Sequence, residues 1–570
     1  MPEITYTPHI RRLFLFMAMV SLIILRQNAY SQDLEKIGEE KAVTFSGSLN
    51  VGAWVYGSQG IEKRRSPFSW YISGSPTLTI YNLTLPFSFT ISEQQRYFSQ
   101  PFNRFGVSPY YKWVTLHGGY RSMYFSDYTL AGEVFLGGGV ELNPGKFRFA
   151  AMYGRFRKAV EEVTDTSLNI PNLPASYKRM GYGMKVGFGS KSSFVDFIIF
   201  KAADDSSSLP QRPVNTPVRP MDNLVLGVRS NILIANRVTF NFDVSASALT
   251  LDTKTVESFE IPQELSPYQN LLTINQSTIF NTAGHASLHY NGDNFGLMFK
   301  VKRIDPGYQS LGIYYIQSDL IDYTVSPDLR LFKGKLYLKS SFGIRKDNLN
   351  NKKPAETRRT IGSAALNFNP TSKFGMSVNY ANYGTSQASG LIQLNDSIRM
   401  SVVNTTYGGN IRFTNVNERI VSSFIIMTNY NEFNDQNQYT QDFTESSSVV
   451  GNASYNFSIV KTGTSFNVSY NVTNFKNNFS NVFSHGPVAG VSMQFLEKKL
   501  TAAVNLNYQK RRSDEVDDGG IFQGSLRFSY RIKDKHTFNL ESFYTRNNSG
   551  NISSFTYNEQ RISLRYGYTF

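Results

Sequence analysis

The chain has 570 residues and a formal net charge of +15, with 14% aromatic residues, 18% charged residues and no cysteine. The lack of cysteine excludes disulfide scaffolds, thiolate metal sites and cysteine nucleophiles. Ordinary apolar content with few charges and many tyrosine, phenylalanine and glycine residues excludes an intrinsically disordered protein. Length alone would suggest three or four soluble domains of about 150 residues, but no linker-like change of composition divides the chain.

The N-terminal residues have the layout of a secretory signal. Arg11 and Arg12 precede the apolar run Leu13–Leu25, which then breaks at polar residues. A spanning helix needs about 20 apolar residues, so this run is too short for a permanent anchor, although an uncleaved anchor is the alternative. Small residues follow, and we predict a signal peptide over residues 1–31, cleaved between Ser31 and Gln32.

The rest of the chain shows a hydrophobic period of two. Apolar and polar residues alternate over Val43–Val55, Val238–Ala248 and Leu336–Arg345. Such alternation is typical of strands with two unlike faces, and about ten residues suffice for a tilted strand to cross a membrane. We therefore predict a short periplasmic segment over residues 32–42 and a transmembrane antiparallel β-barrel over residues 43–570.

Connections of two lengths separate these strands. Short polar turns are expected at Asn143–Lys146, Gly189–Ser193, Ile234–Arg237, Asn291–Asn294, Phe332–Lys335, Asn369–Lys373, Thr414–Glu418, Val460–Gly463, Leu496–Lys499 and Ile532–Lys535. Longer polar loops are expected at Arg157–Ser176, Ala202–Asp222, Thr250–Thr278, Arg345–Arg358, Ala381–Ser397, Asn431–Ser447 and Lys510–Gly520. Short periplasmic turns and long extracellular loops are typical of outer-membrane barrels. The spacing of the turns predicts 24 to 26 strands, the even number that such barrels prefer.

Two features complicate the strand assignment. Soluble propellers and β-solenoids also repeat strands, but a propeller blade fits four short strands into the length that holds two long strands here. Pro76, Pro86 and Pro109 fall inside or beside expected strands, where proline cannot donate a ladder hydrogen bond. Boundaries between Trp70 and Gly139 are therefore the least defined.

The C-terminal strand places Ile562, Leu564, Tyr566, Tyr568 and Phe570 on one face and ends on the last aromatic residue. This pattern resembles the C-terminal signal of Gram-negative outer-membrane β-barrel proteins, although no subfamily is recognised. The resemblance implies residence in the outer membrane, contact with its lipid and lipopolysaccharide, and recognition of Tyr566, Tyr568 and Phe570 by the barrel-assembly machinery.

TonB-dependent receptors resemble the chain in strand number, but they carry a globular plug before the barrel. Only about ten residues separate the expected cleavage site from the first strand at Val43, so we expect a barrel without its own N-terminal plug. Such a wide barrel must fill with water, be narrowed by inward loops or be stoppered by another chain.

The sequence indicates no enzyme, cofactor or nucleic-acid site. His285 and His289 share a strand face but lie roughly 13 Å apart at about 3.3 Å per residue, too far to share one metal ion. No catalytic triad, phosphate loop or concentrated basic patch is present.

Charges on the face opposite the apolar one suggest a basic lumen. Its candidate cations are Arg148, Lys300, Lys302, Lys339, Arg345, Arg412, Arg527 and Arg565. Asp243 and Glu541 are the main acids expected beside them. Charges at mid-depth on the lipid face cost a few kcal/mol each, so a lumenal position is favoured. We predict a channel or transport protein with an anion-preferring lumen. Two alternatives stay open: the cations are neutralised by loop acids or lipopolysaccharide, or the barrel is a non-conducting part of an export or assembly machine, filled by loops or a partner protein.

Overall fold

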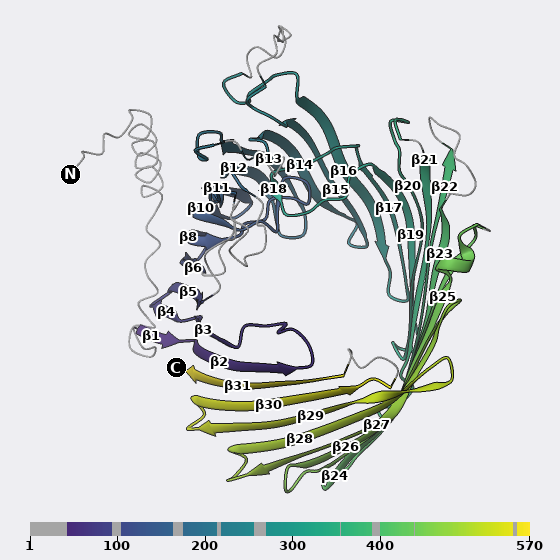
Figure 1. The fold of residues 1–570 in the computed structure, drawn as a ribbon. Coiled ribbons are helices and arrows are strands. Elements are labelled where there is room, and N and C mark those ends of the chain that lie inside the picture. Colours follow the sequence, from purple (N-terminus) through teal and green to yellow (C-terminus); the bar gives the residue numbers. More distant parts are fainter. Residues whose placement is uncertain are drawn as a thin grey trace.

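The computed structural model describes residues 43–93, 104–162, 175–211, 213, 218–255, 269–353, 355–389, 400–437, 439–550 and 556–570. These residues form a closed antiparallel barrel of 26 strands, seen as a ring in Figure 1. The prediction of an all-β barrel with 24 to 26 strands is confirmed. The expected signal peptide, its cleavage between Ser31 and Gln32 and the segment 32–42 lie outside the described residues. No helix in the described part of the chain is long and apolar enough to cross a membrane.

The first part of the wall is built from short strands. They are β1 (Val43–Ser46), β2 (Ser48–Gln59), β3 (Phe68–Gly74), β4 (Thr77–Ile80), β5 (Leu83–Ser92), β6 (Arg104–Val107), β7 (Tyr110–Tyr111) and β8 (Val114–Arg121). β1 pairs with β4, and β2 pairs with β3 in the same register. β1 and β2 therefore act as one wall strand with a break in it, and so do β3 and β4. β6 and β7 likewise share one register on β5.

Prolines cause two of these breaks. Pro76 separates β3 from β4, and Pro109 separates β6 from β7, because neither residue has an N–H to give to the ladder. Pro86 lies within β5 opposite Thr77. The carbonyl oxygens still take part: Pro76 O accepts from the N–H of Phe87 at 2.8 Å, and Pro86 O accepts from the N–H of Ser108 at 3.1 Å. The wall is therefore continuous despite its prolines.

The rest of the wall consists of longer strands in chain order. They are β10 (Phe135–Leu142), β11 (Phe147–Arg157), β12 (Lys178–Gly189), β13 (Phe194–Asp205), β14 (Asp222–Ile234), β15 (Val238–Thr250), β16 (Thr278–Asn291), β17 (Phe295–Ile304), β19 (Leu320–Leu331), β20 (Leu336–Lys346), β21 (Ala355–Phe368), β22 (Phe374–Ser389), β23 (Ser401–Val416), β24 (Ile420–Asp435), β25 (Ser446–Ile459), β26 (Thr464–Asn477), β27 (Asn481–Phe495), β28 (Leu500–Ser513), β29 (Val516–Ile532), β30 (His536–Asn548) and β31 (Tyr557–Thr569). A single short helix, α2 (Gln441–Thr444), interrupts the described loops.

The barrel closes where the last strand meets the first. β31 pairs with β2 from Ser48 opposite Thr569 to Gln59 opposite Asn558. Past the end of this ladder, the rings of Phe45 and Phe570 stack at 4.4 Å between centroids, nearly parallel. The two ends of the described chain therefore seal the sheet and leave no open edge in the wall.

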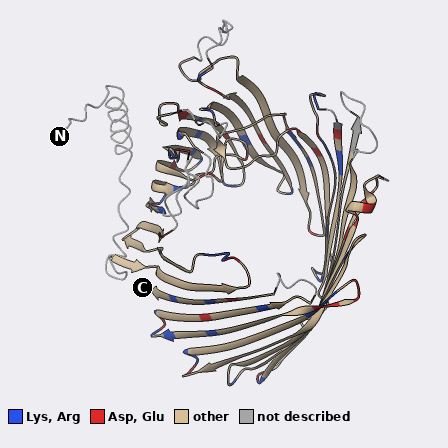
Figure 2. Cartoon of the chain, in the orientation of Figure 1, with Lys and Arg blue, Asp and Glu red and all other residues tan. Residues whose placement is uncertain are grey.

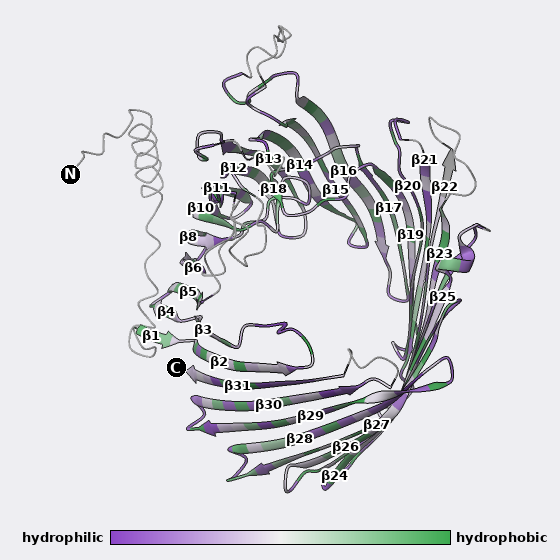
Figure 3. Cartoon of the chain, in the orientation of Figure 1, coloured by the Kyte–Doolittle hydropathy of each residue, from purple (hydrophilic) through white to green (hydrophobic). Residues whose placement is uncertain are grey.

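The two faces of the wall differ in polarity. On β17, Phe299 and Val301 are exposed, whereas Lys300 and Lys302 point to the opposite side. Figure 3 shows the same alternation of hydrophobic and hydrophilic residues along the other long strands. Exposed aromatic and aliphatic residues on the outside of a closed sheet form the lipid-facing surface that an outer-membrane barrel requires. The two faces of β17 therefore fit a transmembrane barrel, with the apolar side chains outward and Lys300 and Lys302 inward.

Connection lengths alternate as predicted, with three corrections. Strand pairing continues through much of three expected long loops, Ala381–Ser397, Asn431–Ser447 and Lys510–Gly520. In the last of these only Asp514 and Glu515 lie between β28 and β29, both with positive φ, as in a tight hairpin turn. Their polar composition predicts loops, but strands that extend beyond the lipid bilayer have polar residues on both faces.

Candidate functional site

Two loops turn into the lumen and pair with each other. The first inner segment, Met123–Glu133, links β8 to β10, and the second inner segment, Asp305–Asp319, links β17 to β19. Each contains a two-residue strand, β9 (Leu130–Ala131) and β18 (Gly312–Ile313), and these strands pair in parallel. Figure 1 shows β18 inside the ring. Thr250–Thr278, the longest of the expected loops, is described only in part.

The inner segments build a hydrophobic core against the lumenal face of the wall. The larger cluster joins both segments to β10, β11, β13, β14 and β15, and its fully buried members include Phe125, Leu130, Phe135, Phe200 and Val225. A second cluster contains Tyr128, Ala283, Ile304, Tyr308 and Leu320. These apolar lumenal residues would be unfavourable in a water-filled pore, and the inner segments remove them from water.

Glycines in the wall make room for this packing. A Cβ at Gly139 would lie 2.5 Å from the sulfur of Met123, and one at Gly183 would lie 2.8 Å from the ring of Phe125. Both distances are too short for any side chain. The glycines therefore serve close packing against the wall, because neither position has positive φ.

Polar contacts fix the two segments in place. The N–H of Asp127 donates to Oδ2 of Asp243 on β15 at 3.0 Å, and the Tyr128 hydroxyl lies 3.0 Å from Nδ1 of His285. Nε2 of His285 lies 3.0 Å from Oδ1 of Asn241. The Tyr308 hydroxyl donates to the main-chain oxygen of Tyr128 at 2.6 Å. His285 is thus a lumenal polar residue that supports the first inner segment.

Lumenal charges form a row across neighbouring strands. Successive cross-strand partners in this row are Arg148, Gly187, Asp196, Arg229, Asp243, His285, Lys302, Asp322, Arg345 and Arg359. Positive and negative residues mostly alternate along it, so that most cations face an acid across a strand. Directly opposed unlike charges stabilise a sheet, and like charges destabilise it.

The strongest pairs in the row are bidentate. Arg148 donates through Nε and Nη2 to the two carboxylate oxygens of Asp196, at 2.7 and 2.9 Å. Arg345 does the same with Asp322, at 2.6 and 2.7 Å. The Asp196 side chain is completely buried, and the Gly187 position leaves space for its carboxylate. Two of the predicted lumenal cations are therefore neutralised by strand acids that the sequence analysis did not single out.

Four of the predicted cations have no ion pair within the described residues. Lys302 lies between His285 and Asp322 in register, but the Asp322 carboxylate pairs with Arg345. Lys300 lies between Ser287 and Thr324 in register. Arg412 lies opposite Gly375 on β22. Lys339 lies opposite Asp328, but that carboxylate pairs with Arg330 at 3.1 Å.

Two arginines on the far wall complete the predicted set. Arg527 and Arg565 share one carboxylate, with Glu541 accepting from Arg527 at 2.7 Å and from Arg565 at 3.1 Å. Figure 2 shows that Lys and Arg occur on strands around the ring, with Asp and Glu among them. The eight predicted residues therefore occupy several parts of the lumen and do not make one basic ring.

Sequence alternation alone could have found the acids that were missed. Asp196 lies between Val195 and Phe197, and Asp322 lies one position before the exposed Tyr323. Each acid therefore occupies a lumenal position of its strand. No group of three or more histidine, aspartate or glutamate residues in the described ranges could hold a metal ion.

The C-terminal aromatics lie on the outer face near the closing seam. Tyr566 packs on Phe538 at 4.9 Å between ring centroids, and Tyr568 lies 5.4 Å from Phe570. The Tyr566 hydroxyl is 2.8 Å from Nδ1 of His536. In the assembled barrel these three residues therefore form one aromatic strip at the edge where the chain closes.

Comparisons with known proteins give a fold and no closer relationship. No protein-family model matches the chain, and no curated protein matches it. Among solved structures, the outer membrane protein opdK from Pseudomonas aeruginosa is 11% identical, with 62% of this chain and 94% of that chain covered and a TM-score of 0.30. The FrpB iron transporter from Neisseria meningitidis is 10% identical, with coverage of 95% and 84% and a TM-score of 0.37. The P pilus usher translocation pore is 11% identical, with coverage of 92% and 99% and a TM-score of 0.35. With its closed wall, lipid-facing apolar surface and alternating short and long connections, the chain has the fold of a large transmembrane antiparallel β-barrel.

Proposed function

We propose that the protein is a transport channel whose solute path runs along the lumenal wall away from the inner segments, and that its unpaired cations favour anions. The inner segments pack on strands from β10 to β19. Elsewhere the lumenal face is hydrophilic, as in the hydrogen-bonded pairs Asn452–Asn471 and Asn456–Asn467, each at 2.6 Å. A lining of amides suits a water-filled path.

The observation that carries the anion preference is the set of lumenal cations without an ion pair in the described residues, Lys300, Lys302, Lys339 and Arg412. Paired cations such as Arg148 and Arg345 contribute little net charge, because each faces a carboxylate at hydrogen-bond distance. Unpaired cations raise the local concentration of anions in a narrow aqueous space. The preference should therefore depend on these residues and should weaken in concentrated salt.

Conductance in a planar bilayer tests this proposal. The folded barrel, identified by its different migration before and after boiling, should show steps with an anion-directed reversal potential in a KCl gradient. Lys300→Gln, Lys302→Gln and Lys339→Gln together should reduce that potential. Lys333→Gln, Lys335→Gln and Lys461→Gln in short turns remove the same charge outside the lumen and should change it less. Cation selectivity of the native barrel would contradict the proposal.

A second candidate function is a non-conducting component of envelope export or assembly. The inner segments favour it, because their buried core and β9–β18 pairing occupy lumenal space with fixed structure. Absence of conductance from correctly folded protein, together with recovery of a partner protein from the envelope, would support this function over the first.

We also propose that Tyr566, Tyr568 and Phe570 guide insertion by the barrel-assembly machinery. They share the outer face of β31 with the exposed Ile562 and Leu564, and this face ends at the seam between β31 and β2. Phe570→Ser should lower the amount of heat-modifiable barrel in the outer membrane, whereas Thr569→Ser should leave it unchanged. Equal amounts of both variants would contradict this role.

A further inference from the structure

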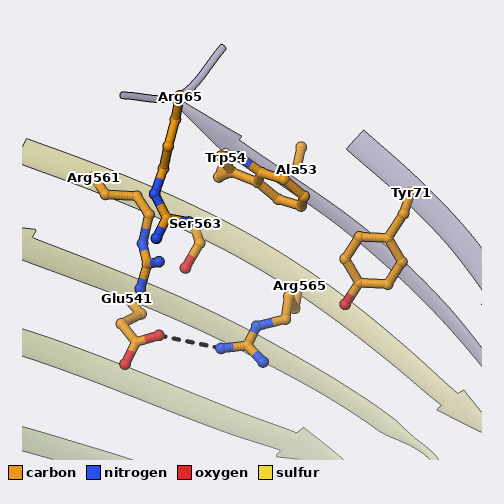
Figure 4. A pocket seen from close by; sticks show the side chains of 8 residues that line it. All are labelled: Ala53, Trp54, Arg65, Tyr71, Glu541, Arg561, Ser563 and Arg565. Carbon is orange, nitrogen blue, oxygen red and sulfur yellow. Dashed lines mark hydrogen bonds and ion pairs between the residues drawn. The ribbon is translucent and has the colours of Figure 1, made fainter. Parts of the chain in front are cut away.

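A pocket lies on the lumenal side of the closing seam. It is lined by Ala53, Trp54, Arg65, Tyr71, Glu541, Arg561, Ser563 and Arg565, and it encloses about 220 Å³. Figure 4 shows the arginines gathered around Glu541, with Trp54 and Tyr71 beside Arg565. Ile562 and Leu564, the alternate residues of β31, are the lipid-exposed ones, so Arg561 and Arg565 point into the lumen.

The acids around this pocket are already engaged by other cations. Glu541 accepts hydrogen bonds from Arg527 and Arg565. Glu559, on β31, accepts from the Tyr56 hydroxyl at 2.6 Å and lies 3.6 Å from Arg64. Neither Arg65 nor Arg561 has a hydrogen bond or ion pair with an acid in the described part of the chain.

The pocket lining is therefore cationic. Its three arginines and one glutamate give a formal charge of +2 (three minus one). A second pocket, of about 520 Å³, shares Arg65 and Arg561 with the first. The guanidinium groups of Arg65 and Arg561 thus line both pockets, and an anion in either pocket can reach them.

An aromatic wall adjoins these cations. The rings of Trp54 and Tyr71 lie 6.1 Å apart between centroids. A Cβ at Gly52 would lie 2.3 Å from the Tyr71 ring, so only glycine lets that ring lie over β2. Flat rings beside planar guanidinium groups provide both stacking and bidentate hydrogen bonding.

We propose that this seam pocket binds a small aromatic carboxylate, with the carboxylate on Arg65 and Arg561 and the ring against Trp54 and Tyr71. Arginine forks match a carboxylate in two parallel hydrogen bonds. Ligand pockets for larger molecules span about 300–1,000 Å³, so the smaller volume here suits a single ring. The inference deepens the proposed function, because it rests on a lumenal solute path and names the solute class that the path would take.

Equilibrium binding of benzoate to the full folded barrel in detergent tests the site. Benzoate should bind once per chain. Cyclohexanecarboxylate, with equal charge and a puckered ring, should bind more weakly because it cannot stack. Inorganic phosphate should bind weakest, since it has no ring for the aromatic wall.

Substitutions locate the binding. Arg561→Gln and Arg65→Gln should each weaken benzoate binding at least tenfold, through loss of a charged hydrogen-bond donor. Arg561→Lys keeps the charge but not the fork, and it should fall between Arg561→Gln and the native protein. Trp54→Leu should remove the preference for benzoate over cyclohexanecarboxylate. Arg419→Gln, in an exposed short turn, is the matched control and should bind as the native protein does.

Three results would overturn the inference: no benzoate binding by the native barrel, unchanged binding in heat-modifiable Arg561→Gln and Arg65→Gln, or equal affinity for the two carboxylates. Conductance measured on the same protein shows whether the binding site or the proposed channel function has failed. An anion-biased channel that does not bind benzoate would lose only the seam site. A silent barrel that binds benzoate would retain the site and lose the channel.

Discussion

The hydroxyl of Tyr308 donates a hydrogen bond to the main-chain oxygen of Tyr128 at 2.6 Å, across 180 residues of sequence. This bond joins the two inner segments, and Ser310 adds a second one to the main-chain oxygen of Thr129, at 2.5 Å. The N–H of Leu311 then donates to Oδ1 of Asn223 at 3.0 Å, which ties the pair to β14. The inner segments are therefore one unit, held by the wall and by each other.

Removal of the Tyr308 ring should detach the second inner segment. Tyr308 is 2% exposed and packs with Ile304 and Leu320, so Tyr308→Ala leaves a cavity as well as an unsatisfied oxygen. Loss of a large buried aromatic costs about 3–5 kcal/mol. Amide hydrogen exchange of residues 305–319 should then be at least about a hundredfold faster, since about 1.4 kcal/mol is a factor of ten.

Tyr314→Ala is the matched control, because Tyr314 lies in the same segment and is 81% exposed. It should leave exchange unchanged. If the channel proposal holds, Tyr308→Ala should also widen the conducting steps. Equal exchange in the two variants would show that the segment is not held by this ring.

Strand geometry could be read from the sequence because it depends on local alternation. The positions of Phe299, Lys300 and Val301 alone assign the two faces of β17. The inner segments could not be predicted, because the bond between Tyr308 and Tyr128 depends on residues far apart in sequence. Their polar residues resemble those of any extracellular loop.

The charge on the lumen was predicted only in part, for a related reason. Alternation assigns Arg148 and Arg345 to the face opposite the apolar one, but their net effect depends on which acids lie opposite them. Those acids, Asp196 and Asp322, come from neighbouring strands whose register the sequence alone does not define. Composition therefore overstated the free positive charge.

Neutralisation of Asp196 should strongly destabilise the barrel. Asp196→Asn leaves Arg148 with an uncompensated charge in a largely buried position. Breaking one side of such a pair costs about 3–5 kcal/mol. The urea midpoint for unfolding in lipid vesicles should fall, as measured by tryptophan fluorescence or by loss of heat-modifiable migration.

Asp293→Asn tests whether the effect requires burial. Asp293 pairs with Arg237 at 3.1 Å in a short turn, where both side chains are exposed. Its unfolding midpoint should match that of the native protein, because exposed ion pairs contribute little. A comparable loss in both variants would mean that net charge, and not the buried pair, controls stability.

Glycine at position 183 should be required for the packing of the first inner segment. Gly183→Ala places a methyl group 2.8 Å from the Phe125 ring, and the ring must shift. Overpacking of this kind costs about 1–3 kcal/mol. Hydrogen exchange of residues 123–133 should accelerate, while Gly451→Ala, whose nearest neighbour would lie at 4.0 Å, should not change it. If residues 123–133 exchange as slowly in Gly183→Ala as in the native protein, the packing role of Gly183 is contradicted.

Acid should release the end of the second inner segment. Burial raises the pKa of Asp319, but hydrogen bonds from Lys353 and from the N–H of Leu349 outweigh it, so the pKa lies below its ordinary value. Asp347 lies 3.9 Å from the same ammonium group and competes for it. A carboxyl whose pKa is lowered by folding stabilises the fold above about pH 4, and this stabilisation is lost as pH falls through the folded pKa.

A spin label on Tyr314→Cys can follow this release, since the native chain has no cysteine that would also take the label. Label mobility should stay low from pH 7 to about 4 and rise as the pH falls further, through the lowered pKa of Asp319, where its carboxyl becomes protonated and loses its attraction for Lys353. Asp319→Asn in the same background should show the mobile signal at neutral pH and little change on acidification. Asp293→Asn, which removes a carboxylate from a distant turn, should retain the native transition. A transition that persists unchanged in Asp319→Asn would assign the acid sensitivity to another group and remove Asp319 from the hold on the segment.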